Sequence, residues 1–139
     1  MNPPYFVIYT DKLPDIVGGR ATGFIVRIRP KYRDDAGIHA HELVHVKQWY
    51  TGLAVGLAVA AAMYWQAIDG WPLAILFGAV LHPLATVLKR YTFWKEVVAY
   101  REQAKYYADD RRLLFANFIS QNYGLNVTTE QAYAALIKD

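Results

Sequence analysis

The chain has 139 residues and a mass of 15.9 kDa, which predicts one domain over residues 1–139 and leaves no room for a separate regulatory module. Its net charge of +3 and its isoelectric point near 9.1 come without a compact basic run, so we expect no nucleic acid as a partner. The absence of cysteine excludes disulfides and thiolate metal ligands, and it is typical of a reducing compartment. We also expect no cleaved secretory signal, because the N-terminus lacks a basic region followed by an apolar stretch.

Two strands are predicted near the N-terminus. Residues 5–9 (YFVIY) and 21–29 (ATGFIVRIR) are rich in β-branched and aromatic side chains, and polar and apolar positions alternate in the second segment. Turn residues at Gly18-Gly19 precede the second strand, and Pro30 ends it. The sequence therefore predicts a small N-terminal β-sheet.

The segment HELVH at residues 41–45 is the most informative motif of the chain. Two histidines four positions apart lie on one face of a helix, where both can bind the same metal ion. Glu42 follows the first histidine directly and is close enough to handle a proton of a metal-bound water. Asp34 and Asp35 are suitable helix-start residues, and nothing breaks a helix from residue 38 to residue 49. The motif predicts a metal site suited to hydrolysis.

Zinc is the metal that these ligands favour. A catalytic Zn²⁺ takes three protein ligands and leaves a fourth position for water, so a third ligand is needed. The metzincin pattern is excluded, because Gln48 and Thr51 occupy the places of its glycine and third histidine. His39 lies about 200° around the helix from His41. His82, beside a proline in an uncharged run, is more typical of a structural hydrogen-bonding residue.

Glu96 is the preferred third ligand. It lies in the segment TFWKEVVAYRE, which has a helical pattern and places Glu96, Ala99 and Tyr100 on one face. The small Ala99 allows this helix to approach the HExxH helix closely. The alternative is a solvated glutamate that pairs with Tyr100 or Arg101.

An uncharged hairpin separates the two motifs. Residues 51–68 and 71–88 contain no Asp, Glu, Lys or Arg, and the turn dipeptide Asp69-Gly70 joins them. Each run is close to the roughly 17–20 residues that a bilayer-spanning helix needs. Three small residues spaced four apart allow close packing of two helices, and basic residues flank the base of the hairpin: Gly52, Gly56 and Ala60, and Lys47, Lys89 and Arg90.

Two environments remain open for residues 51–88. Inserted in lipid, the hairpin would hold the chain at the cytoplasmic face of a membrane. Covered by its own core, by an oligomer contact or by another protein, it would leave a soluble cytoplasmic chain. His82 and Pro83 are costly in lipid and favour the second environment.

The remaining chain is predicted to be helical. A third-ligand helix is expected from Phe93 to about Phe118, and a short C-terminal helix begins at Thr128 with a capping box to Gln131. The expected fold class is therefore α+β and mainly α, with a small N-terminal sheet, the HExxH helix, the apolar helical hairpin, the third-ligand helix and the C-terminal helix.

HExxH followed at a distance by a Glu-x-x-Ala helix resembles the gluzincin zinc metallopeptidases, most closely the integral-membrane HtpX and CAAX-prenyl-protease kind. The resemblance implies a zincin-like fold, with His41, His45 and Glu96 as zinc ligands and Glu42 as general base. It also implies that extended substrate lies along the sheet near residues 21–29.

One position departs from that family. Tyr100 stands where the family has an aspartate that orients a ligand histidine. Four other acidic residues are available for that role in principle: Asp34, Asp35, Asp109 and Asp110.

The function expected is hydrolysis of a peptide or protein substrate by metal-activated water. One alternative is a non-catalytic structural or assembly protein with a vestigial metal site, anchored by the hairpin. Another is a hydrolase that acts on a different class of substrate.

Overall fold

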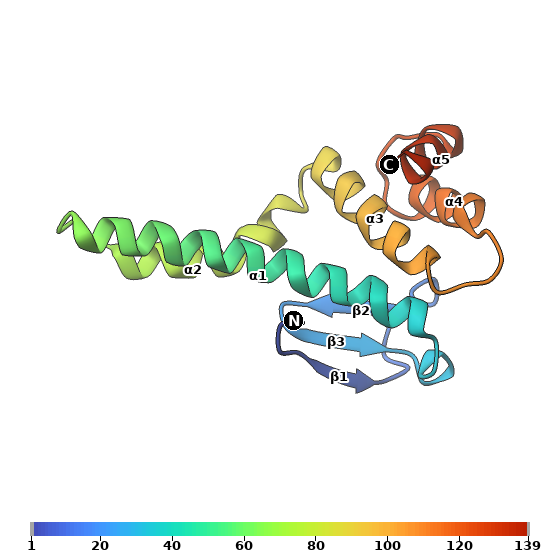
Figure 1. Ribbon diagram of the computed structural model, residues 1–139, viewed down its shortest axis with the longest axis horizontal. Coiled ribbons are helices and arrows are strands. Elements are labelled where there is room, and N and C mark those ends of the chain that lie inside the picture. Colours follow the sequence, from blue (N-terminus) through green and yellow to red (C-terminus); the bar gives the residue numbers. More distant parts are fainter. Residues whose placement is uncertain (1, 139) are drawn as a thin grey trace.

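The computed structural model describes residues 2–138, which form a three-stranded sheet and five α-helices (Figure 1). The fold is α+β and mainly helical, as the sequence predicts. In chain order the elements are β1 (Phe6–Tyr9), β2 (Gly19–Thr22), β3 (Ile25–Ile28), the 3₁₀ turn η1 (Pro30–Tyr32), α1 (Ala36–Trp65), α2 (Trp71–Ala85), α3 (Lys89–Ala104), α4 (Arg112–Asn122) and α5 (Thr129–Ile137).

The sheet has the strand order β1-β3-β2, with β3 parallel to β1 and antiparallel to β2. The prediction of one strand over residues 21–29 is wrong, because a tight turn divides that segment. Gly23 adopts a φ of +61°, a left-handed conformation that glycine tolerates and that reverses the chain between β2 and β3. The turn predicted at Gly18-Gly19 is also misplaced, since Gly19 already belongs to β2.

Helix α1 contains the HExxH motif and continues for 30 residues without interruption. Asp35 caps it by accepting a hydrogen bond from the Ile38 amide at 3.0 Å. The N-terminal half packs on the sheet through Val46, which is buried against Val26 and Ile28. The C-terminal half extends beyond the sheet (Figure 1). The motif helix and the first uncharged run are therefore one element rather than two.

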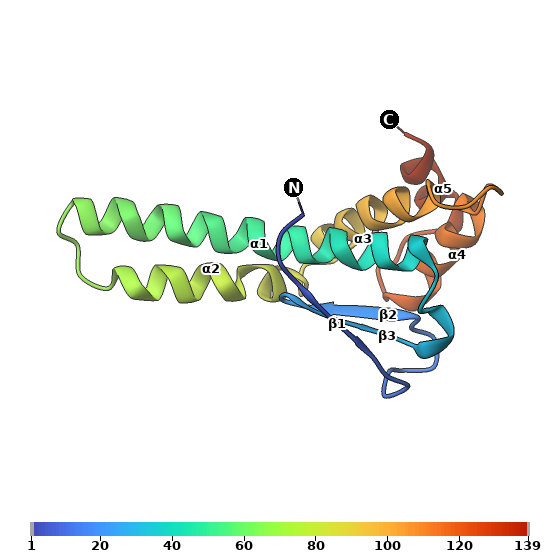
Figure 2. The ribbon, with the colours of Figure 1, turned by 60° about the horizontal axis from the view of Figure 1, so that its bottom comes forward.

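Helix α2 runs back along the C-terminal half of α1, and the two form a hairpin that projects from the body (Figure 2). The predicted turn is present, and Gly70 adopts a φ of +87° at its end. The helices touch through glycines: a Cβ atom added at Gly78 would lie 2.6 Å from the Gly56 Cα. Taken singly, none of the helices within residues 2–138 has both the length and the apolarity for a membrane span, whereas α2 and α3, bent by 86°, pass such a test as a pair.

The C-terminal helices form a second core against α3. The helix predicted from Phe93 to Phe118 is wrong in its extent, because α3 ends at Ala104 and α4 begins at Arg112. The break turns α4 back onto α3 and buries apolar side chains that a straight continuation would expose to water. Helix α5 begins with the predicted capping box of Thr128 and Gln131. The buried residues of this core are Val97, Tyr100, Phe115, Ala116, Ile119, Leu125, Ala132 and Leu136.

Candidate metal centre

Three potential ligand atoms converge where α3 crosses α1. The Nε2 atoms of His41 and His45 lie 3.2 Å apart, and each lies 3.5 Å from Oε2 of Glu96. A tetrahedral zinc ion with bonds of about 2.0–2.1 Å to nitrogen and oxygen has ligand atoms about 3.3 Å apart. The three atoms therefore form one face of a tetrahedron of the right size, and the residues present fit a zinc ion.

The centre is buried and holds polar atoms without partners. Glu96, Glu42 and His41 are 3%, 4% and 7% exposed. Within residues 2–138, no hydrogen-bond partner is found for Oε2 of Glu96, Oε2 of Glu42 or Nδ1 of His41. Each unsatisfied buried group costs about 1–3 kcal/mol, and such groups are rare in folded proteins. A cation at the centre of the triangle would satisfy the Glu96 oxygen directly.

Glu96 is held in its ionised form. Burial raises the pKa of its carboxyl, but the imidazoles of His41 and His45, each 3.5 Å away, outweigh burial and hold this pKa well below its usual value. Lys95 adds a positive charge, with Nζ at 3.3 Å from Oε1 of Glu96. Burial lowers the pKa of His45, and Glu96 more than compensates, so this pKa lies above its usual value. A carboxylate beside two imidazoles is the ligand set that zinc favours.

Glu42 lies beside the triangle and is not a member of it. Burial raises the pKa of its carboxyl, the nearby His41 and His45 act in the opposite direction, and the charge of Glu96 raises it further. A carboxyl whose pKa is raised toward neutrality is suited to general-base chemistry. Gly19 of β2 leaves the space that this carboxyl occupies, because a Cβ atom there would lie 2.8 Å from Oε1 of Glu42.

Gln48 orients His45, a contact that sequence reasoning missed. Nδ1 of His45 lies 2.9 Å from Oε1 of Gln48, and Nε2 of Gln48 donates to the Lys95 carbonyl oxygen at 3.4 Å. With Nε2 of His45 turned to the triangle, the Nδ1–H donates to Gln48. The signal in the sequence is the i, i+3 spacing of these residues on α1, where the sequence interpretation used Gln48 only to exclude the metzincin pattern.

His41 has a different neighbour. The Tyr100 ring lies edge-on against the His41 ring, with centroids 4.4 Å apart, and the Tyr100 hydroxyl lies 3.2 Å from that of Tyr123. Tyr100 therefore packs against the ligand histidine and directs its hydroxyl elsewhere.

The acidic residues considered for orienting a histidine make other contacts. Asp35 caps α1 and accepts a hydrogen bond from the Tyr107 hydroxyl. Asp109 pairs with Arg111, Asp110 pairs with the first residue of α4, and Asp34 is exposed.

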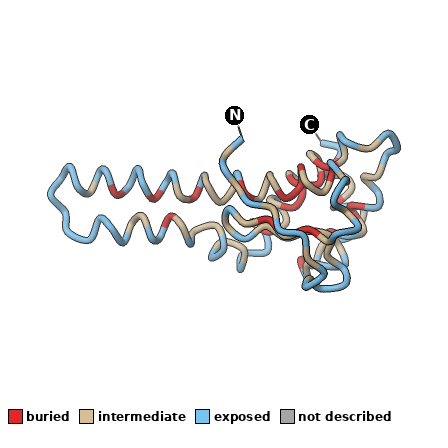
Figure 3. The backbone as a smooth tube through the Cα atoms, turned by 90° about the horizontal axis from the view of Figure 1, so that it is seen from below, coloured by how far each residue is buried: buried red, intermediate tan, exposed pale blue. Residues whose placement is uncertain are grey.

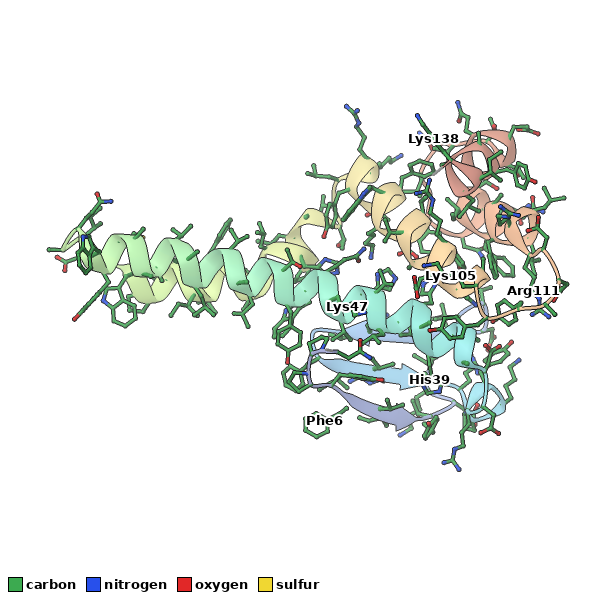
Figure 4. The ribbon with its side chains drawn as sticks, viewed as in Figure 1. Phe6, His39, Lys47, Lys105, Arg111 and Lys138 are labelled. Carbon is green, nitrogen blue, oxygen red and sulfur yellow. The ribbon has the colours of Figure 1, made fainter. Side chains whose placement is uncertain are left out.

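The other two histidines lie outside the triangle, as expected. His39 lies on the side of α1 toward the sheet (Figure 4). Its Nε2 atom lies 2.8 Å from the Arg33 carbonyl oxygen, and its ring is tilted against that of Tyr9 in β1, with centroids 6.3 Å apart. Nδ1 of His82 lies 2.7 Å from the Tyr91 hydroxyl. His82 makes the structural hydrogen bond that the sequence favours for it, and His39 lies in the first turn of α1.

The expected substrate position needs correction. β3 is paired on both sides, with β1 and with β2, so residues 25–28 have no edge on which another strand can add. Within the described chain, β2 is the edge strand that packs against α1, next to Glu42. An extended chain can pair near the candidate centre only along residues 19–22.

No protein family, curated protein or solved structure with which the chain was compared matches it.

Proposed function

We propose that the protein is a zinc-dependent metallopeptidase of the gluzincin kind, which hydrolyses peptide bonds in peptide or protein substrates. The observation that carries the proposal is the near-equilateral triangle of His41, His45 and Glu96, with the buried carboxyl of Glu42 beside it. The order of the HExxH and Glu-x-x-Ala motifs supports the same assignment.

The ligand residues and Glu42 have separate roles in this proposal. His41, His45 and Glu96 hold the ion, and Gln48 keeps the His45 ring in place. A bound zinc ion supplies Lewis acidity, which lowers the pKa of a water molecule and polarises the scissile carbonyl. Glu42 accepts the proton of the attacking water at a carboxylate oxygen and then transfers it to the leaving amine.

Substrate binding is proposed at the edge of β2. Pairing with residues 19–22 holds an extended peptide through backbone hydrogen bonds, without regard to its side chains. This position brings the substrate backbone next to Glu42, which lies against Gly19. A peptide bond is the group that such a strand presents, which is why peptide hydrolysis is favoured over other hydrolytic reactions.

The main alternative is a non-catalytic assembly protein with a vestigial site. Burial of Glu42 with an unpartnered oxygen counts against it, because a site without catalytic use has no reason to retain a costly buried carboxyl. A purely structural zinc site would also be closed by a fourth protein ligand, whereas the group found within the described chain has three.

The test compares zinc content and peptide cleavage for the full chain. We expect about one zinc per chain by elemental analysis and cleavage of a mixed peptide library, read by mass spectrometry. Glu42→Gln should keep the zinc and lose about 10²–10⁴-fold in turnover. His41→Ala should lose most of the zinc.

Glu102→Gln is the matched control, because Glu102 of α3 pairs with Lys105, directly after the helix, and lies outside the centre. It should leave zinc content and cleavage unchanged. Full activity of Glu42→Gln, or activity that survives removal of all metal, would refute the proposal. Bound zinc without any cleavage would favour the assembly protein.

A further inference from the structure

Most of the apolar hairpin, defined as residues 51–88, is exposed or half-buried (Figure 3). Its large side chains are left uncovered by the rest of the described chain. On α1 and α2 alike, side chains that fold into a core elsewhere are between 48% and 68% exposed here: Val55, Leu57, Val59, Leu73, Leu76 and Phe77. A contiguous apolar surface of this kind marks a site of contact with another phase or molecule.

The contact between the two helices explains why so many apolar side chains point outward. Gly52 and Gly56 of α1 meet Gly78 of α2 backbone to backbone. The large side chains of the hairpin are left half-buried or exposed, because the residues buried within it are all small: Gly52, Gly56, Ala60 and Gly78. On α1, Val55 and Leu57 are about 200° apart around the axis, and both are exposed. Apolar groups therefore face outward on opposite sides of the hairpin (Figure 4). A protein partner covers one face of the hairpin, whereas the hydrocarbon of a bilayer surrounds every face.

Charge and aromatic residues divide the hairpin into a base and a tip. Lys47 on α1 and Lys89 and Arg90 at the start of α3 are exposed where the hairpin leaves the body. Asp69 at the tip is the single Asp, Glu, Lys or Arg between residues 51 and 88. The aromatic rings of Tyr64, Trp65 and Trp71 are 68%, 89% and 39% exposed beside it. Basic residues at the base favour contact with anionic lipid headgroups, and aromatic residues at the tip are typical of a membrane–water interface.

We infer that the apolar hairpin inserts into a lipid bilayer with anionic headgroups, and that the rest of the chain stays on the side from which it enters. The 15 residues of α2 rise about 22 Å, against about 30 Å for the hydrocarbon of a typical bilayer, so the tip passes the midplane and approaches the opposite interface. Insertion requires the backbone groups of both helices to be hydrogen-bonded. Pro83 within α2 has no amide N–H for the Ala79 carbonyl, and Nε1 of Trp49 on α1 donates to that carbonyl at 2.7 Å instead.

The same helix sets the distance of the candidate metal centre from the membrane. His45 precedes Thr51 by six residues in the uninterrupted α1, which is about 9 Å along the axis. Resting on the proposed function, this places hydrolysis at the bilayer surface. The substrates are then polypeptide segments that emerge from the membrane or lie on it.

The insertion is tested with the full chain and phosphatidylcholine vesicles, with and without phosphatidylglycerol. We expect the chain to float with the vesicles and to bind more tightly when the anionic lipid is present. Lipid brominated in its acyl chains should quench tryptophan fluorescence, and the double variant Trp65→Phe/Trp71→Phe should lose most of that quenching. Trp94→Phe, which changes a tryptophan on α3 outside the hairpin, is the matched control and should retain it.

A charge variant tests the orientation. Lys89→Glu/Arg90→Glu should lower the affinity for anionic vesicles at least tenfold, while Lys12→Glu/Lys138→Glu, with the same change in net charge at exposed positions, should lower it far less. Similar losses in both double variants would overturn the placement of the base at the headgroups.

The remaining outcomes separate this inference from the proposed function. The metal-free variant His41→Ala/His45→Ala should bind vesicles as the unmodified chain does. Membrane insertion is therefore tested independently of zinc binding and of peptide cleavage. The inference is overturned if the chain is a monomer in detergent-free buffer and does not bind vesicles. It is also overturned if the chain forms a stable dimer that does not bind vesicles, because a second copy then covers the hairpin.

Discussion

Gln48 shows how much of the candidate centre depends on residues that do not touch the ion. Its amide oxygen lies 2.9 Å from Nδ1 of His45, and its amide nitrogen holds the Lys95 carbonyl, so one side chain ties the ligand on α1 to the helix that carries Glu96. Loss of a group that orients a ligand histidine typically weakens metal binding about 10–100-fold.

Gln48→Leu should therefore lower zinc affinity by about that factor, measured by competition with a chromogenic chelator. Gln48→Glu retains an acceptor for the His45 Nδ1–H and should recover most of the affinity. Gln121→Leu, at an exposed position on α4, is the control. Equal affinities of Gln48→Leu and the unmodified chain would show that Gln48 does not orient His45.

Gly19 permits a test of Glu42 that leaves Glu42 itself in place. A Cβ atom at residue 19 would lie 2.8 Å from Oε1 and 3.0 Å from Cγ of Glu42, so Gly19→Ala must displace the carboxyl. We expect turnover on the peptide library to fall at least tenfold with zinc content unchanged.

Gly18→Ala is the neighbouring control for Gly19→Ala. Its Cβ atom would meet the Ile38 and Tyr32 side chains at 3.2 Å, away from Glu42. If both variants keep full turnover, the position of the Glu42 carboxyl against β2 is not needed for cleavage.

At the scale of elements, α1 is the part that connects the regions of the molecule. Its N-terminal half packs on the sheet and carries two candidate ligands, and its C-terminal half forms one arm of the hairpin. Because it is uninterrupted, it joins the candidate ligands His41 and His45 directly to the hairpin.

Gly78→Leu should separate the two arms of the hairpin. A Cβ atom at Gly78 already comes within 2.6 Å of the Gly56 Cα, so a larger side chain forces the backbones apart. Overpacking of this kind costs about 1–3 kcal/mol in the free energy of unfolding, measured by chemical denaturation. Ala61→Leu adds a similar volume at an exposed position on α1 and should change it by less than about 0.5 kcal/mol.

For the whole molecule, the candidate centre joins two cores. One core lies between α1 and the sheet, and the other lies between α3 and the C-terminal helices. The triangle takes two ligands from α1 and one from α3, so a bound ion links them. Anything that binds the folded chain alone stabilises it in proportion to the logarithm of its concentration.

Zinc at 100 times its dissociation constant should therefore stabilise the chain by about 2.7 kcal/mol, seen as a higher melting temperature that a chelator reverses. The zinc-dependent shift should fade as the pH falls through the pKa of His45. Glu96 raises this pKa above its usual value, and the protonated imidazole cannot bind a metal. His41→Ala/His45→Ala should show no zinc-dependent shift, and a shift of normal size in that variant would place the zinc elsewhere.

The features that could be predicted from the sequence are those set by neighbours along the chain. The i, i+4 spacing places His41 and His45 on one helix face, the capping box starts α5, and the Asp69-Gly70 turn closes the hairpin, because each depends on interactions within a few residues. The close helix contact at Gly52 and Gly56 also followed from local spacing.

Only the tertiary structure decided the rest, because it depends on long-range packing. Helix α3 ends at Ala104, and this break allows Phe115 and Ile119 to be buried. The gain from burying these apolar side chains ends the helix there, because it outweighs the local helical pattern of the sequence. Because the segment divides into β2 and β3, β3 is hydrogen-bonded to a neighbouring strand on each side, and β2 becomes the edge strand beside Glu42. Glu96 reaches the two histidines, 51 and 55 positions away in sequence, because α3 crosses α1 at the height of the motif. The spacing of residues along one helix is set by the backbone, whereas the approach of two helices is set by the side chains that both of them bury.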